Sequence, residues 1–391
     1  MPPPVTEAPR LLVATPGKPL DPGTWSGTSA FLIRALEQAG ALAGAVDASS
    51  QAVDRVEQLA SFSPNRARWR QRYHSRSSVA SGLARSLRSV VARRRLDGEP
   101  DVVLHVGAWS QLPGRFRASY HDGNLAVSLA RGEPLLDPSS RSVRRALESD
   151  RRFYDEMDLL LPMSDWVRRS FVEDYGQDPD KVVTVGAGAN LRELPDVPAR
   201  TYEQPRLLFV GKQWERKGGP QLLEAFRHVH DERPDAELWI VGPERPPARA
   251  PGVRFLGRVS RAGADGERRL GELYGGATAF AMPSVYEPFG IVFLEAMAYG
   301  LPCVASDRCA MPEIVADGVS GFTVDAQDVD ALGQRLLDLT DPERARAFGE
   351  AGRQRLVERF TWDAVAGRIV EAVASRTGPR ATSAPGGPPR A

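Results

Sequence analysis

The stretch that decides the fold covers residues 284–299 and reads SVYEPFGIVFLEAMAY. Glu287 and Glu295 are its only charged residues. Ile291, Leu294 and Met297 recur at helical spacing, which predicts a helix with one apolar face. A carboxylate beside such a face is costly unless it has a partner. Glu295 is therefore either part of a structural ion pair or cap, or an acceptor for the hydroxyl groups of a ligand.

The segments on either side predict that this helix begins at the edge of a parallel sheet. Residues 277–282 and 301–305 are short apolar runs typical of buried strands. The loop 287–290 then lies at the carboxyl end of a strand, where open α/β sheets bind ligands. The first N–H groups of the helix, near Gly290 and Ile291, form a seat for a phosphate.

A second loop carries positive charge. Residues 206–211 are predicted to form a strand and residues 220–229 a helix with one apolar face. The loop between them contains Lys212, Arg216 and Lys217. Cations in this position suit a diphosphate, because its negative charge must be neutralised when it leaves.

Strand-like and helix-like segments alternate along the whole chain. Alternation of this kind predicts an α/β fold with parallel sheets and helices on both faces. The proline-rich segment 190–205 interrupts it and is interpreted as a linker. We therefore expect two doubly wound, Rossmann-like domains. The strands are expected at 10–15, 101–106, 116–120, 159–163 and 181–185 in the first, and at 206–210, 237–241, 253–256, 277–282 and 301–305 in the second.

The loop Glu-Pro-Phe-Gly followed at this spacing by Glu-Ala-Met-Ala resembles the signature of retaining GT-B glycosyltransferases, in the large sucrose-synthase-like family (glycosyl transferases group 1). The resemblance implies two Rossmann-like domains that face each other across a cleft. The predicted boundaries are an acceptor-side domain at 1–189, the linker at 190–205, a nucleotide-sugar-binding domain at 206–358, a helix at 359–375 that packs back on the first domain, and a disordered tail at 376–391.

The resemblance also implies a reaction: transfer of a sugar from a nucleoside-diphosphate sugar to an acceptor hydroxyl, with retention of anomeric configuration. In the family the second glutamate, here Glu295, holds the ribose of the donor. The first, here Glu287, faces the hydroxyls of the transferred sugar. The loop backbone touches sugar and diphosphate, and it corresponds here to Phe289, Gly290 and Ile291.

The basic residues of the family match positions in the second loop. Lys212 and Lys217 are expected to stabilise the departing diphosphate, with Arg216 beside them. Family members often have arginine at the first position, so Lys212 is a departure. Val259, at the end of the segment 255–259, is expected to contact the nucleotide base through its backbone. Because a backbone contact does not depend on the side chain, the sequence does not distinguish between GDP, UDP and ADP.

Two positions in the first domain are further candidates. The loop 20–28 resembles the glycine loop of the family, although Gly27 and Gly23 replace a tighter glycine pair. Gly27 is expected to contact donor phosphate or acceptor through its backbone, with a plain helix cap as the alternative. His121 follows a strand beside Asp122, and both are expected at the strand's carboxyl edge, facing the cleft. We expect His121 to touch the donor sugar, with a structural histidine as the alternative.

The charge of the chain and its distribution indicate which kinds of partner the protein binds. The net charge of +1 predicts no general attraction to nucleic acid. Residues 58–96 contain no Asp or Glu, yet they hold ten arginines between Arg66 and Arg95. This stretch predicts a surface for an anionic acceptor or an anionic membrane leaflet, with a solvated helical face as the alternative. The N-terminal residues lack signal-peptide character, and no apolar run is long enough to span a bilayer. We expect a cytoplasmic protein, with peripheral contact to the inner face of the membrane as an option.

Neither metal nor cofactor is expected besides the nucleotide-sugar substrate. No Asp-x-Asp motif occurs where the donor phosphates should lie, and Cys303 and Cys309 have no zinc spacing. The segment 186–190 lacks the third glycine of a dinucleotide fingerprint, which argues against hydride transfer. The alternatives are a sugar-nucleotide epimerase or a phosphorylase on the same fold, and a non-catalytic nucleotide-sugar-binding protein.

Overall fold

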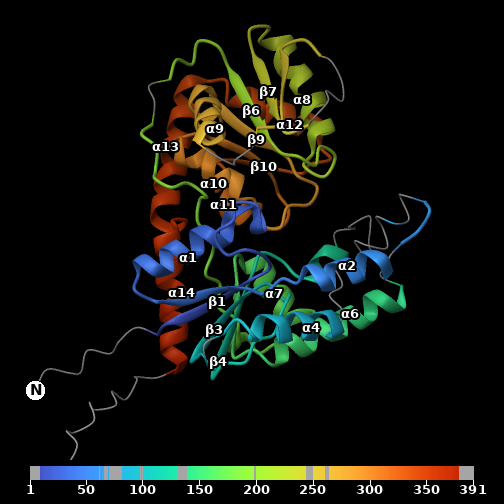
Figure 1. Cartoon of the computed structure of the whole chain (residues 1–391). Helices are drawn as coiled ribbons and strands as arrows, with labels where there is room; N and C mark the ends of the chain where they lie inside the picture. The colour runs from blue at the N-terminus through green and yellow to red at the C-terminus, as the bar shows by residue number, and fades with distance from the viewer. Residues whose placement is uncertain are drawn as a thin grey trace, which may run out of the picture.

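The computed structural model shows two α/β units, one above the other, with a pair of long helices along one side (Figure 1). The structure describes residues 9–60, 62–65, 69, 82–96, 98, 100–130, 139–197, 200–243, 250–259 and 264–377. Each unit contains one sheet in which all the paired strands are parallel. The predicted fold class, two doubly wound α/β units, is confirmed.

The first sheet has the strand order β2-β1-β3-β4-β5. Its strands are β1 (Leu11–Thr15), β2 (Leu42–Asp47), β3 (Val102–Val106), β4 (Phe116–His121) and β5 (Leu159–Pro162). The helices of this unit are α1 (Thr28–Gln38), α2 (Gln51–Ala60), α4 (Gly82–Arg93), α5 (Leu125–Ala130), α6 (Arg141–Asp155) and α7 (Asp165–Glu173). A short 3-10 turn, η1 (Thr24–Gly27), leads into α1.

The second sheet has the order β11-β10-β9-β6-β7-β8. Its strands are β6 (Arg206–Val210), β7 (Glu237–Val241), β8 (Val253–Gly257), β9 (Ala279–Met282), β10 (Cys303–Ser306) and β11 (Gly321–Val324). The helices that follow β6 are α8 (Gly219–Glu232), α9 (Ala264–Gly276), α10 (Ile291–Ala298), α11 (Met311–Ile314), α12 (Val329–Asp338) and α13 (Pro342–Arg359). Counted from β6, this is the Rossmann order 3-2-1-4-5-6, whose topological switch point lies between β6 and β9.

The last helix, α14 (Trp362–Thr377), returns to the first unit and packs against α1 (Figure 1). The guanidinium of Arg368 donates to the carbonyl of Val185 over 2.8 Å. The indole of Trp362 donates to Asn190 over 3.2 Å. The chain thus crosses between the units twice, once through 190–205 and once before α14.

Three strand expectations differ from the structure. Residues 181–185 form no strand of the sheet: a 3-10 turn, η2 (Pro179–Lys181), is followed by a single bridge between Leu160 and Val182. The edge strands β2 and β11 were not predicted. The first, LAGAVD, is poor in β-branched residues, and the second, GFTV, is only four residues long. Both therefore give a weak periodic signal.

Candidate active site

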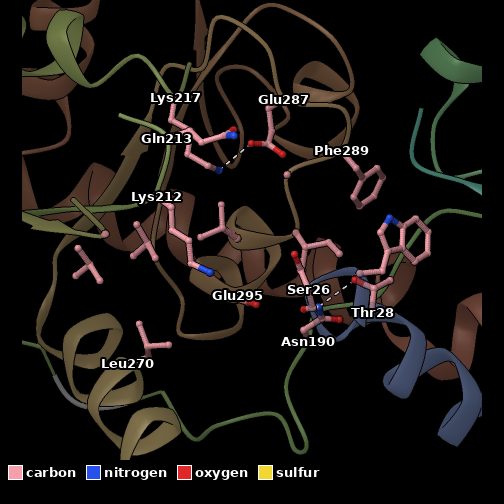
Figure 2. A pocket seen from close by; sticks show the side chains of 18 of the residues that line it. Ser26, Thr28, Asn190, Lys212, Gln213, Lys217, Leu270, Glu287, Phe289 and Glu295 are labelled. Atoms are coloured by element: carbon pink, nitrogen blue, oxygen red, sulfur yellow. Dashed lines mark hydrogen bonds and ion pairs between the residues drawn. The ribbon is translucent and has the colours of Figure 1, made fainter. Parts of the chain in front are cut away.

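A cavity of about 590 Å³ lies between the two units, and Figure 2 shows the side chains that line it. The second unit contributes the loops that follow β6 and β9, together with Arg258 and Val259 after β8. The first unit contributes parts of the segment 22–28 and Asp122, which follows β4. The cavity therefore sits at the switch point of the second sheet, where doubly wound folds bind ligands.

A close backbone approach joins the two loops of the second unit. Gly218 has a φ of +72°, and a Cβ on it would lie 1.9 Å from the carbonyl oxygen of Pro283. The N–H of Val285 donates to the carbonyl of Arg216 over 3.0 Å. Only glycine fits this contact in this conformation, so the sequence Lys-Gly-Gly at 217–219 is what brings the cations to the glutamate loop.

Glu287 is held by the cations of the other loop. The Nζ of Lys217 lies 2.8 Å from its Oε2, and the Nη2 of Arg216 lies 3.6 Å from the same atom. Figure 2 shows Lys217 and Glu287 pointing toward each other. Arg216 is fixed by a 2.5 Å hydrogen bond to the carbonyl of Tyr286. An ion pair this enclosed fixes the position of both side chains, and it holds Glu287 at the wall of the cavity.

Glu295 is buried on α10 with an exposed fraction of 1%, yet it lines the cavity. The hydroxyl of Tyr274, on α9, donates to its Oε2 over 3.2 Å. Tyr299 stacks on Tyr274 with ring centroids 5.4 Å apart, and the Glu295 charge adds to burial in raising the pKa of Tyr299. The carboxylate is thus supported by tyrosines from one side and faces the cavity on the other.

The N-terminus of α10 also faces the cavity. Gly290 precedes the helix in a left-handed conformation, with a φ of +88°, and no side chain caps the first N–H groups. The cavity is lined here by Phe289, Gly290 and Ile291. Lys212 also lines the cavity, and its side chain extends toward Glu295 in Figure 2. Among the described residues Lys212 makes no ion pair. An uncapped helix N-terminus beside a lysine favours an anion.

The first unit brings an unusual turn to the opposite wall. Trp25 and Ser26 both have positive φ angles, 47° and 58°, which are rare for residues other than glycine. Asn190 holds this turn, since its Nδ2 donates to the carbonyl of Ser26 and to the hydroxyl of Thr28. Strain of this kind is retained mostly at functional positions. Sequence reasoning missed Asn190, because the residues that it contacts lie 164 and 162 positions earlier in the chain.

Asp122 occupies the wall of the cavity that faces Glu287. Removal from water, with the Glu287 charge as a further cause, raises the pKa of Asp122 to about 6. A carboxyl with this pKa is available both as an acid and as a base near neutral pH.

The structure corrects the expectation for His121. It does not point into the cavity but lies on the opposite face of the first sheet, 3% exposed. Its ring packs against Tyr154 of α6 and Phe171 of α7, at 5.4 and 5.2 Å. The reason is strand alternation, which sends successive side chains to opposite faces. Burial lowers the pKa of His121 to about 3, so it is neutral.

The expectation for Gly27 also needs correction. Gly27 does not line the cavity; it precedes α1 with a φ of +85°, while Ser26 and Thr28 face the cavity.

The expectation for the arginine-rich stretch needs correction as well, because Arg85 and Arg88 do not face solvent. They are buried and ion-paired, Arg85 with Asp150 over 2.6 Å and Arg88 with acids of α2. Residues 66–68 and 70–81 of that stretch lie outside the described residues.

The two units touch beside the cavity as well as across it. The carboxylate of Glu313, on α11, accepts hydrogen bonds from the backbone N–H groups of Asp165 and Trp166, both over 2.7 Å. It thereby caps the N-terminus of α7 from the other unit. Nearby, the hydroxyls of Ser128 and Tyr286 are 3.0 Å apart. These contacts hold the two walls of the cavity together.

Comparison with solved structures agrees with this geometry. The sucrose-phosphate synthase from Thermosynechococcus elongatus aligns over 94% of this chain and 99% of its own, with a TM-score of 0.63 and 18% identity. The glycosyltransferase WaaG, involved in lipopolysaccharide biosynthesis, aligns over 92% and 98%, with a TM-score of 0.65 and 15% identity. At these identities the likeness shows the fold alone. Fold and cavity together define a protein of the GT-B class.

The sequence comparisons match the second unit to a family model. Residues 204–341 match the model described as Glycosyl transferases group 1. It is 33% identical over 252 residues to the alpha-maltose-1-phosphate synthase of Mycolicibacterium smegmatis, covering 57% of this chain and 64% of the relative. It is 35% identical over 223 residues to the phosphatidyl-myo-inositol mannosyltransferase of Mycobacterium leprae, covering 54% and 57%. The matches thus span less than two thirds of these relatives.

Proposed function

We propose that this protein transfers a sugar from a nucleoside-diphosphate sugar to an acceptor hydroxyl and retains the anomeric configuration. The observation that carries the proposal is the convergence of two lysines, an arginine, an uncapped helix N-terminus and two carboxylates at the switch point of the second sheet. Cations and helix N–H groups suit a diphosphate. Carboxylates suit the hydroxyls of a ribose and a sugar.

The positions of these groups suggest how a donor would lie. Glu295, steadied by Tyr274, would accept hydrogen bonds from the ribose hydroxyls. Lys212 and the N-terminus of α10 would bind the diphosphate between them. Glu287, fixed by Lys217, would orient the sugar toward the first unit. The acceptor would then enter from the side of Trp25 and Asp122.

The same arrangement favours attack from the face that the diphosphate leaves. The bond from the anomeric carbon to the phosphate oxygen breaks, and the bond to the acceptor oxygen forms on the same face. The acceptor proton passes to the departing phosphate. Glu287 is tied into an ion pair with Lys217, which suits a role in orientation rather than one as a nucleophile. Lys212, Arg216 and Lys217 would stabilise the negative charge that develops on the diphosphate.

Steady-state kinetics with a set of nucleotide sugars and acceptors test the proposal. Lys217→Ala should reduce kcat about 10²- to 10³-fold, the usual cost of removing a group that stabilises developing charge. Lys18→Ala, which removes an exposed lysine that does not line the cavity, is the matched control and should leave kcat unchanged. Nuclear magnetic resonance of the product should show the anomeric configuration of the donor. An inverted product, or a Lys217→Ala variant as fast as the control, would contradict the proposal.

A further inference from the structure

The helix α4 has its polar and apolar sides reversed. Arg85 and Arg88 are on its buried side, with exposed fractions of 3% and 4%. Leu83, Leu87 and Val90 follow one another at helical spacing on its outer side, and they are 70%, 46% and 53% exposed. A surface helix ordinarily turns its apolar stripe toward the core. An apolar stripe on the outside therefore requires an explanation.

Specific contacts fix this rotation of the helix. Arg85 pairs with Asp150 over 2.6 Å and donates to the carbonyls of Ser149 and Ala108 over 2.8 and 2.9 Å. Arg88 pairs with Asp54 and Glu57 of α2 over 2.8 and 2.7 Å. Turning the leucines inward would bury them among these charges and break every one of these bonds. The outward position of the leucines is thus built into the packing.

The neighbouring helix extends the same kind of surface. Val56 and Leu59 of α2 and Phe62 just beyond it are exposed. Figure 1 shows α2 and α4 on the same side of the lower unit, and Arg88 joins them directly. We use the name α2–α4 face for the exposed residues Val56, Leu59, Phe62, Leu83, Leu87 and Val90.

The charge around the α2–α4 face is positive. Arg55 of α2 and Arg93 and Arg94 at the end of α4 are exposed. Both acids of α2, Asp54 and Glu57, are occupied by Arg88, and the sequence from 58 to 96 contains no Asp or Glu. Apolar side chains flanked by arginines complement a surface with an apolar interior and an anionic boundary.

We propose that the α2–α4 face docks this protein on an anionic lipid bilayer. Leu59, Leu83 and Leu87 enter the boundary between headgroups and acyl chains, and the arginines contact lipid phosphates. No helix among the described residues is long and apolar enough to cross a membrane. The proposal uses none of the residues of the cavity and stands independently of the transfer reaction.

Vesicle flotation with the full chain tests this proposal. The protein should float with vesicles that contain phosphatidylglycerol and remain at the bottom with pure phosphatidylcholine. Leu83→Gln, Leu87→Gln and Val90→Gln combined should weaken binding by about tenfold or more, because three apolar side chains no longer leave water. Arg93→Gln with Arg94→Gln should weaken it by about fivefold for each charge. The arginine pair is a second, independent test.

A matched control lies in the second unit, where Val319 and Val357 are 56% and 47% exposed. Changing both to glutamine should leave flotation unaffected. Equal flotation of the triple variant and wild type would overturn the proposal, as would failure of the wild type to bind anionic vesicles. Sedimentation of the protein without lipid tests whether a second copy of the chain covers the α2–α4 face. A wild-type dimer that the triple variant converts to a monomer would assign the face to that second copy and overturn the proposal.

Discussion

Glu287 and Glu295 are both enclosed carboxylates, but they are supported in different ways. Glu287 is paired with a lysine 2.8 Å away, whereas Glu295 accepts a hydrogen bond from the hydroxyl of Tyr274. The sequence indicated that both would face a ligand, because each follows a strand of a doubly wound sheet. It could not indicate their partners, since Lys217 is 70 residues away from Glu287 along the chain. That pairing depends on the contact between Gly218 and Pro283.

Predictions in the first unit depended on which face of a strand a residue occupies. His121 and Asp122 are adjacent, yet one lies among aromatic rings and the other lines the cavity. The strand position alone placed both at the correct edge. The side of the sheet was undetermined, because both faces of β4 are buried, so the alternation in FRASYH does not show which face is turned toward the cavity.

Buried neutral histidines predict sensitivity to acid. Burial is the main cause that lowers the pKa of both His105 and His121 to about 3. The unfolded chain takes up these protons below about pH 6.5, so their contribution to stability is lost as the pH falls from there toward 3. Asp122 has the opposite effect on stability below about pH 6. Its pKa is raised in the folded state, so the folded protein binds this proton at a higher pH than the unfolded chain does.

His121→Phe should therefore flatten the decline in stability. Phenylalanine keeps the ring contacts with Tyr154 and Phe171 and removes a buried ring nitrogen, Nε2, that has no hydrogen-bond partner. The unfolding free energy of the wild type should fall relative to the variant by about 1.4 kcal/mol per pH unit below about pH 6.5. Urea unfolding at several pH values measures this. Parallel curves for the two proteins would show that His121 is not neutral in the folded state.

Among the elements, the cavity depends on the turn between β6 and α8. Gly218 combines a positive φ with the close approach to Pro283. Gly318 has a similar φ, +68°, but open space around its missing side chain. Substitutions at the two positions therefore separate two losses of stability: the one caused by the left-handed conformation and the one caused by the contact with Pro283.

Gly218→Ala should be far more harmful than Gly318→Ala. The control should lose about 1–2 kcal/mol, the cost of a left-handed alanine. The alanine at 218 must in addition move the glutamate loop, which should add about 1–3 kcal/mol and abolish nucleotide binding. Denaturant unfolding and nucleotide titration measure the two effects. Similar losses for both variants would mean that the two loops are not in contact.

The sequence predicted most elements that surround the cavity, because buried strands and the helix of 291–298 have strong apolar patterns. It predicted the reversed helix α4 less well. The arginines of that helix were interpreted as a charged surface, although two of them pair with Asp54, Glu57 and Asp150. Those acids come from α2 and α6, so local charge composition gave no sign that the arginines would be buried.

On the scale of the whole molecule, Glu313 links the two units beside the cavity. Glu313→Ala would leave the first N–H groups of α7 without their acceptor and remove a bond between the walls. We expect a loss of about 0.5–2 kcal/mol in stability, a larger radius of gyration by solution scattering, and a raised KM for the donor. Glu343→Ala, at an exposed position in α13, is the matched control. Unchanged scattering and KM would show that this cap does not hold the cavity closed.

The central claim is that the cavity between the units is a nucleotide-sugar site built around Glu295. Thermal unfolding with UDP, GDP and ADP tests it most directly, using wild type, Glu295→Ala and the exposed control Glu371→Ala. At 100 times its dissociation constant, a nucleotide should stabilise the wild type and the control by about 2.7 kcal/mol. One of the three should do so selectively, and Glu295→Ala should lose the effect. Equal stabilisation of the Glu295→Ala variant, or no stabilisation of the wild type by any of the three, would contradict the account.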